Sequence, residues 1–181
     1  MKHFFAADKL PVSPWRNGGG ETREIMVWPP DSADFSWRLS IATLSQDGVF
    51  SSFPGVDRII TLVSGADVTL SSPHWQHHLQ KGQPFAFAGE EQVFARLNGG
   101  VSQDFNLMTR RASHQATMIL TDSAQQAPAG SSGVVYVLAG SWQVGGRVLQ
   151  QSQGLWWHQH RPDFTPQHSG SLLLYAIIRC R

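Results

Sequence analysis

The chain contains an internal repeat, and this limits the folds it can adopt more than any other feature. Apolar runs that end at Gly65 and at Gly140 resemble each other, and each continues into a second short strand-like stretch. The matching segments, in chain order, are 59–65 with 134–140, 81–87 with 153–157, and 107–111 with 176–180. Self-similarity of this kind predicts two copies of one structural unit. Each copy has the pattern of a strand, a glycine turn, a strand, a loop and a long closing strand.

The period of the apolar residues favours β-strands nearly everywhere. Residues 35–42 alternate, with Phe35, Trp37, Leu39 and Ile41 on one side and small or charged residues, including Arg38, on the other. Other apolar runs are short, rich in β-branched residues and bounded by Gly or Ser, as in 58–63, 134–138 and 172–178. The best candidate for a helix is 74–80, which follows a proline. The chain is therefore predicted to be all-β.

Composition narrows the range of partners. Lys and Arg total 14 and Asp and Glu total 13, so the net charge of +1 provides no basic field for nucleic acid or an anionic membrane. No stretch approaches the ~20 apolar residues of a transmembrane helix, and Asp8 and Lys9 cut short any signal-like run at the start. The one cysteine, Cys180, cannot form an internal disulfide. We therefore expect a cytoplasmic protein.

Small residues between the two copies suggest a domain boundary. We predict an N-terminal barrel over 1–122, a linker over 123–133, and a second barrel over 134–181 that strands from the N-terminal half complete. The order of strands and glycine turns resembles that of a cupin, a small jelly-roll barrel of the RmlC-like type. Two such barrels in one chain form a bicupin, which is the fold we expect.

Polar residues gather in the first copy. Three glycines, 18–20, follow Trp15 and Asn17, and such a run permits positive φ and a wide turn across a barrel mouth. Several arginines lie in strand-like segments, namely Arg23, Arg38, Arg58, Arg96 and Arg110. A guanidinium inside a barrel would hold a ligand carboxylate at two points, whereas one at the surface would form ordinary ion pairs.

Five ordered blocks of the chain resemble the HutD/Ves family, and the match spans most of residues 10–111. The blocks are 15–25, 35–42, 47–58, 84–87 and 104–110, and the later segment 133–144 is most similar to the Ves branch. The resemblance implies a bacterial bicupin. It associates the HutD branch with histidine utilisation, where a small acidic intermediate is thought to bind, and the Ves branch with environmental stress.

The resemblance and the residue types together predict a binding site for a small acidic metabolite in the N-terminal barrel. Its predicted lining comprises apolar walls from Trp15, Phe50 and Phe87, cationic donors from Arg23, Arg38 and Arg58, and orienting amides from Asn17 and Asn106. The protein would act as a regulator or sensor, without a cofactor and without a catalytic residue. Carboxylates would act as acids or bases only if they share a pocket, the candidates being Glu21, Glu24, Asp57 and Asp104.

Two other functions are left open. His158 and His160 have the spacing at which two imidazoles on one strand face reach the same ion, and Asp163 and His168 follow them. This alternative is a metal-dependent isomerase or dioxygenase. The other alternative is a protein-interaction module whose barrel is filled by its own side chains. A homodimer is compatible with each of the three.

Overall fold

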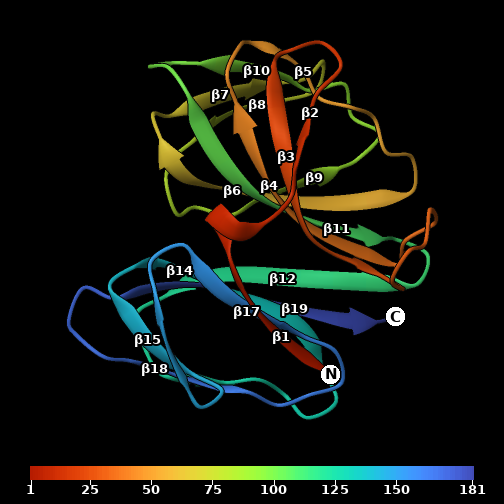
Figure 1. Ribbon diagram of the computed structural model, residues 1–181. Coiled ribbons are helices and arrows are strands. Elements are labelled where there is room, and N and C mark those ends of the chain that lie inside the picture. Colours follow the sequence, from red (N-terminus) through yellow and green to blue (C-terminus); the bar gives the residue numbers. More distant parts are fainter. The chain divides into compact units, whose positions relative to one another are not determined.

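The computed structural model describes residues 1–181 and is built of β-strands, with one short 3₁₀ helix, η1 (Ala7–Lys9) (Figure 1). The chain divides into two compact units. The first, which we call the N-terminal barrel, contains Pro11–Gln115 together with Arg181, and the second, the C-terminal barrel, contains Met1–Leu10 and Ala116–Cys180. The prediction of an all-β chain is confirmed. None of its helical segments has the length and apolar composition needed to span a membrane.

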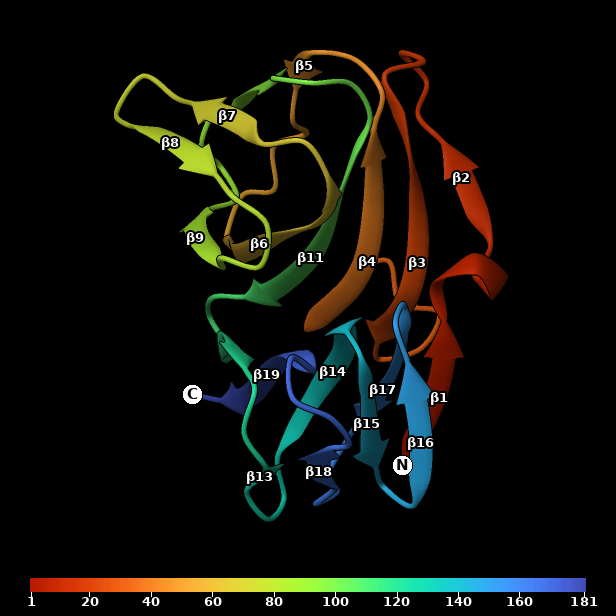
Figure 2. The same cartoon turned by 90° about the vertical axis from the view of Figure 1, so that its left-hand side faces the viewer.

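The N-terminal barrel consists of a six-stranded and a four-stranded sheet. The larger sheet has the order β2 (Val12–Pro14), β3 (Gly20–Trp28), β4 (Trp37–Leu44), β11 (Ser102–Arg110), β6 (Val56–Gly65), β9 (Phe85–Ala88). The smaller sheet has the order β5 (Gly48–Val49), β10 (Phe94–Leu97), β7 (Val68–Ser71), β8 (Gln76–Leu79). Figure 2 shows β2, β3 and β4 running side by side. The helix expected over 74–80 is wrong, because this segment pairs with β7 as strand β8.

The C-terminal barrel has a five-stranded and a four-stranded sheet. The first has the order β1 (Lys2–Ala6), β17 (Gln153–Trp157), β14 (Ser132–Ala139), β19 (Leu172–Cys180), β12 (His114–Thr121). The second has the order β13 (Gln125–Gln126), β18 (Asp163–Pro166), β15 (Ser141–Val144), β16 (Arg147–Gln150). Thus β1, from the start of the chain, completes a sheet whose other strands come from the end. The division into units differs from the predicted boundaries here, because 1–10 and 116–122 belong to the C-terminal barrel and the segment 123–133 contains β13.

The repeat extends further than the sequence match. The strand orders β4-β11-β6-β9 and β5-β10-β7-β8 of one barrel recur as β12-β19-β14-β17 and β13-β18-β15-β16 in the other. Strands β4 to β11 therefore correspond in chain order to β12 to β19. The two turn glycines are equivalent in detail, since Gly65 (φ 86°) and Gly140 (φ 70°) both have left-handed backbones. A Cβ at either would come within 3 Å of the Cα of a serine, Ser102 or Ser171, so both turns need glycine.

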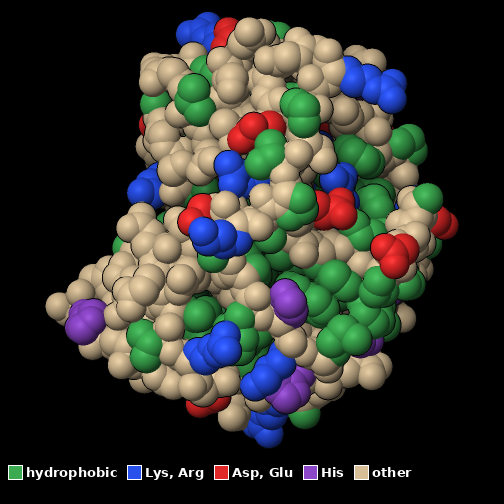
Figure 3. Space-filling view, in the orientation of Figure 1, with side chains coloured by type: hydrophobic (Ala, Val, Ile, Leu, Met, Phe, Trp, Pro, Cys, Tyr) green, Lys and Arg blue, Asp and Glu red, His purple; other side chains and the backbone are tan.

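Each barrel has its own apolar core. The inward side chains of β6, β7 and β10 form the core of the N-terminal barrel, together with residues of the adjoining strands and loops. In the C-terminal barrel the core includes Trp142, Trp157, Phe164 and Tyr175. Lys, Arg, Asp and Glu side chains are few on the face shown in Figure 3 and leave most of it neutral, as expected for a chain with 15% charged residues.

Candidate functional site

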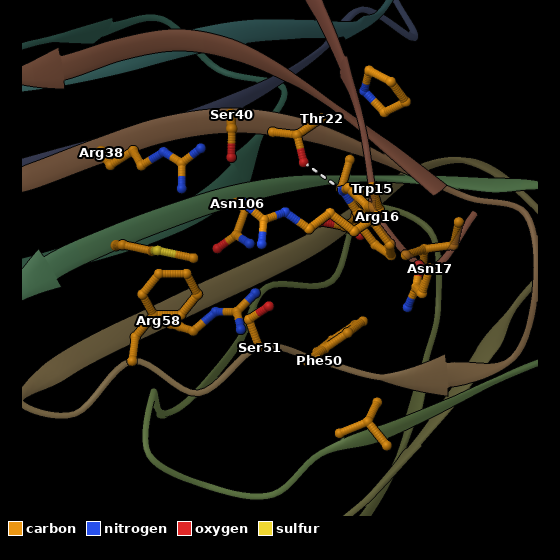
Figure 4. Close-up of a pocket in the computed structure, with 17 residues that line it drawn as sticks. Trp15, Arg16, Asn17, Thr22, Arg38, Ser40, Phe50, Ser51, Arg58 and Asn106 are labelled. Atoms are coloured by element: carbon orange, nitrogen blue, oxygen red, sulfur yellow. Dashed lines mark hydrogen bonds between the residues drawn. The ribbon is translucent and has the colours of Figure 1, made fainter. Parts of the chain in front are cut away.

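A cavity of about 480 Å³ opens inside the N-terminal barrel (Figure 4). Its floor is formed by β4, β11 and β6. Because inward side chains recur at every second residue of a strand, each of these strands contributes alternate residues to it. The lining residues are Pro14, Trp15, Arg16, Asn17, Thr22, Arg38, Ser40, Ala42, Leu44, Val49, Phe50, Ser51, Phe53, Arg58, Asp104, Asn106 and Met108. The lining carries three guanidinium groups and one carboxylate, so its charge favours an anion.

The pairing register arranges the floor in rows across β4, β11 and β6. The first row is Arg38, Met108 and Arg58, the second is Ser40, Asn106 and Ile60, and the third is Ala42, Asp104 and Leu62. Directly opposed residues of antiparallel strands share one face of the sheet. The rows therefore change from cationic at one end, through neutral polar groups, to a single carboxylate between apolar neighbours.

Arg58 is the most unusual residue of the cavity. Its side chain is buried, with 5% of its surface exposed, and its guanidinium carbon lies 5.1–5.6 Å from the ring centroids of Phe50, Phe53 and Phe87. The rings hold the group through cation–π attraction, while Nε, which is buried, has no hydrogen-bond partner. Burial lowers the pKa of Arg58 to about 10, against the opposing effect of Asp104. The group therefore stays cationic at neutral pH.

Asp104 is a carboxylate that, like the Arg58 guanidinium, is buried without a direct ion pair. It is 1% exposed, and neither of its oxygens has a hydrogen-bond partner. Burial raises the pKa of Asp104 to about 7, and the charge of Arg58 only partly offsets this rise. The two groups form no direct ion pair, because Asp104 lies in the third row and Arg58 in the first.

Two further arginines extend the positive charge. Arg38 lines the cavity and donates from Nε to Glu24 Oε2 at 3.1 Å. Arg16 lies in the exposed loop between β2 and β3 and lines the cavity as well. Figure 4 shows the side chains of Arg38, Arg58 and Asn106 extending into the same space.

The glycine run has a structural role beside the cavity. The Trp15 indole donates to Thr22 Oγ1 at 2.8 Å, which joins two lining residues from opposite sides of the turn. A Cβ on Gly20 would meet the Thr43 carbonyl oxygen and approach the Trp15 ring at 3.0 Å. Asn17 Oδ1 accepts a hydrogen bond from the Gly19 amide at 2.8 Å. The run lets the Trp15 ring lie against the backbone at the cavity wall.

The structure brings six of the eight predicted site residues to this cavity: Trp15, Asn17, Arg38, Phe50, Arg58 and Asn106. Arg23 is not among the lining residues. It pairs across the strands with Ile41, whose neighbours Ser40 and Ala42 face the cavity, so Arg23 lies on the other face of the sheet and contacts Glu21 at 3.6 Å. Phe87 lies opposite Arg58 in β9 and packs beneath its guanidinium.

Sequence reasoning missed several polar lining residues. Thr22, Ser40 and Ser51 belong to this group, and Arg16 was passed over beside the glycine run. The period of two, applied from Arg38 to Ser40, would have found one of them. Of the carboxylates singled out, Asp104 lines the cavity, Glu24 holds Arg38, and Asp57 accepts from Arg111 at 2.7 Å.

The C-terminal barrel has no counterpart of this polar set. By the shared register, Arg58 corresponds to Gly133, Asp104 to Leu173 and Asn106 to Tyr175. The Trp157 ring occupies the space beside Gly133, since a Cβ there would lie 2.5 Å from its Cζ2. Leu173, Tyr175 and Trp157 all belong to the buried core of this barrel. Only the first copy of the repeat therefore has arginine and aspartate at these positions.

The histidine pair lies outside any strand. β17 ends at Trp157, and Gln159 between the two histidines has a left-handed φ of 49°. His158 Nδ1 is 2.8 Å from the Ser132 hydroxyl. The expectation that His158 and His160 share one strand face is therefore wrong, and no group of three or more His, Cys, Asp or Glu side chains suited to a metal ion occurs in the structure.

Two barrels of the same strand order in one chain, with a polar cavity in the first, define a bicupin. A cupin 2 conserved barrel domain protein from Leptotrichia buccalis shares this fold, with a TM-score of 0.65 and 9% identity over 99% of this chain and 96% of that one. The match to the HutD family model covers residues 7–174, so the chain belongs to the HutD family.

Individual relatives agree with this assignment. Protein Ves of Cronobacter sakazakii is 48% identical over 158 residues, which cover 86% of this chain and 87% of that protein. The solved structure of HutD from Pseudomonas fluorescens SBW25 has a TM-score of 0.88 and 31% identity, and each chain is covered completely. The similarity to HutD and Ves predicted from the sequence blocks is confirmed.

Proposed function

We propose that this HutD-family bicupin binds a small carboxylate metabolite in the cavity of its N-terminal barrel and acts as a ligand-responsive regulator or sensor. The observation that carries the proposal is Arg58. A buried guanidinium without a directly paired anion is costly unless something compensates its charge. A ligand carboxylate would supply that compensation and two hydrogen-bond acceptors in the planar geometry that arginine prefers.

The size and walls of the cavity agree with a small ligand. A volume of about 480 Å³ lies within the range of roughly 300–1,000 Å³ that is usual for small-molecule sites. Trp15, Phe50 and Met108 provide apolar contact, while Ser40, Ser51 and Asn106 provide hydrogen-bonding groups. An open polar cavity also counts against the alternative in which this barrel is filled by its own side chains.

The regulatory part of the proposal depends on the resemblance to the HutD/Ves family. The cavity combines cationic hydrogen-bond donors with one isolated carboxylate. A cytoplasmic location stays a prediction, as does a homodimer.

The test is ligand binding by thermal shift and calorimetry with urocanate, formiminoglutamate and glutamate. A ligand at ten times its Kd adds about 1.4 kcal/mol of stability, which corresponds to roughly 3–5 °C for a chain of this size. Arg58→Met and Arg38→Gln should each remove the shift. Methionine is chosen at position 58 because its apolar side chain can pack against the three surrounding rings. Arg96→Gln, at an exposed position on β10, is the matched control and should keep it. No shift with any acid, or an unchanged shift in Arg58→Met, would overturn the proposal.

A further inference from the structure

Three acceptor atoms on the cavity floor have no partner. They are both carboxylate oxygens of Asp104 and Oδ1 of Asn106, and all three are fully buried in residues that line the cavity. Leaving a buried acceptor unpaired typically costs about 1–3 kcal/mol, and more when the group is charged. The arginines donate hydrogen bonds and explain how the carboxylate of an acid would bind. They do not explain why these buried acceptors are present.

The fold itself does not require a carboxylate at this position. Leu173 occupies the equivalent place in the C-terminal barrel, and Tyr175 the place of Asn106. Both are buried in a well-packed core there. A leucine would also suit Asp104's own neighbours, since Ala42 and Leu62 flank it across the sheet. The carboxylate therefore lowers stability at a position where the same strand arrangement accepts an apolar side chain.

The acceptors lie away from the cationic end of the cavity. Asp104 is four residues along β11 from Met108, which stands between Arg38 and Arg58. At about 3.3 Å per residue this separates the backbones of the two rows by roughly 13 Å. The long arginine side chains shorten the gap between the charged groups, and Asn106 lies in the row between them. A ligand that fills the cavity would meet Arg38 and Arg58 at one end and the acceptors at the other, where Arg16 also lines the cavity from the β2–β3 loop.

We propose that Asp104, assisted by Asn106, makes this cavity specific for small acids that also carry an N–H donor, as an amide, an ammonium or a ring N–H, at the end opposite the carboxylate. The inference rests on the proposed function, because it assigns the second end of the same ligand. Simple monocarboxylates would leave Asp104 unpaired, and dicarboxylates would bring a second anion towards it. Sites built to hydrogen-bond a polar group discriminate strongly against analogues that lack it.

Four acids of similar length separate the contributions of the two ends. Butyrate has no second polar group, succinate has a second carboxylate, succinamate has an amide, and 4-aminobutyrate has an ammonium. Calorimetry on the full chain should show succinamate or 4-aminobutyrate binding at least about tenfold more tightly than butyrate and succinate. In Asp104→Asn this preference should fall to about threefold or less. Removal of a buried, unpartnered carboxylate should leave the variant folded, and circular dichroism would verify this.

The outcomes distinguish the two proposals. Equal binding of all four acids, abolished by Arg58→Met, would overturn the specificity inference and leave the carboxylate site intact. A preference for donor-bearing acids that persists in Asp104→Asn would also overturn it. If none of these acids nor those of the first screen binds at millimolar concentration, the carboxylate site fails and the inference fails with it. Asp67→Asn, at an exposed carboxylate that contacts His78 on the surface, is the matched control and should behave as the wild type.

Discussion

Arg58 and Gly133 occupy the same position in the two barrels. Arg58 lies between Met108 and Phe87 across the sheet, and Gly133 lies between Ile177 and Trp157. In the N-terminal barrel the Arg58 guanidinium lies over the Phe87 ring. In the C-terminal barrel Gly133 has no side chain, and the Trp157 indole occupies the space. This single difference helps to explain why the N-terminal barrel contains a polar cavity and why the C-terminal barrel is packed.

Gly133→Ala should destabilise the protein by about 2–3 kcal/mol, because overpacking a core forces the neighbouring groups to move. The new Cβ would meet the Ala176 carbonyl oxygen and the Trp157 ring. Chemical denaturation measures the change. Gly48→Ala is the control, since nothing lies within 4 Å of its Cβ, and it should change stability by less than about 0.5 kcal/mol. Equal effects of the two substitutions would contradict the packing of Trp157 against Gly133.

Asp104→Asn should make the unliganded protein more stable, and the gain should grow as the pH rises. The pKa of Asp104 is raised from 3.8 to about 7 in the folded state, so the folded protein binds the extra proton between these values. Its contribution to stability is therefore present at low pH and is lost as the pH rises through 7. The shift corresponds to at most about 4 kcal/mol. Urea denaturation of both proteins at pH 5 and pH 8 measures the difference, and a gain that is equal at both pH values would contradict the burial of an unpaired carboxylate.

Phe87→Leu should weaken anion binding while the fold is kept. The substitution removes one of the three rings around the Arg58 guanidinium but preserves an apolar side chain of similar size. Loss of a desolvated cation–π contact is worth about 1 kcal/mol, or roughly fivefold in affinity. Calorimetry with the ligand found in the screen gives the value. Phe94→Leu, at an exposed phenylalanine on β10, should bind as the wild type does, and a similar loss in both variants would show that the rings act only through general stability.

Removal of metal should leave the stability of the protein unchanged. His158 and His160 have no third ligating side chain grouped with them, and the cavity is lined by guanidinium, amide and hydroxyl groups around one carboxylate. Dialysis against EDTA should therefore shift the melting temperature by less than about 1 °C, because structural or cofactor metals couple strongly to stability. A larger shift, restored by one divalent metal and lost in a His158→Ala, His160→Ala double variant, would revive the metal-dependent alternative.

The candidate site could be predicted from sequence only in part, and the cases of Arg23 and Asp104 show why. Arg23 lies in a strand next to β4, as expected, but its partner there is Ile41, which faces away from the cavity. A one-residue change of register would reverse this orientation, and β3 has a bulge next to Arg23, between Glu24 and Met26. The sequence indicated Asp104 only as one of four candidate carboxylates, because its isolation depends on Ala42 and Leu62, which come from two distant strands.

The sequence by itself determined the class of fold and the doubling of the unit, since a period of two and repeated glycine turns are local properties that each segment carries. The sequence also determined that the first copy of the repeat contains the arginines of the site, Arg38 and Arg58. The tertiary structure decided which of these side chains meet. It added β1 to the C-terminal barrel, placed Arg58 among three rings, and left Asp104 without a partner. These features depend on which strands pair and in which register, and that choice depends on contacts between residues far apart in the chain.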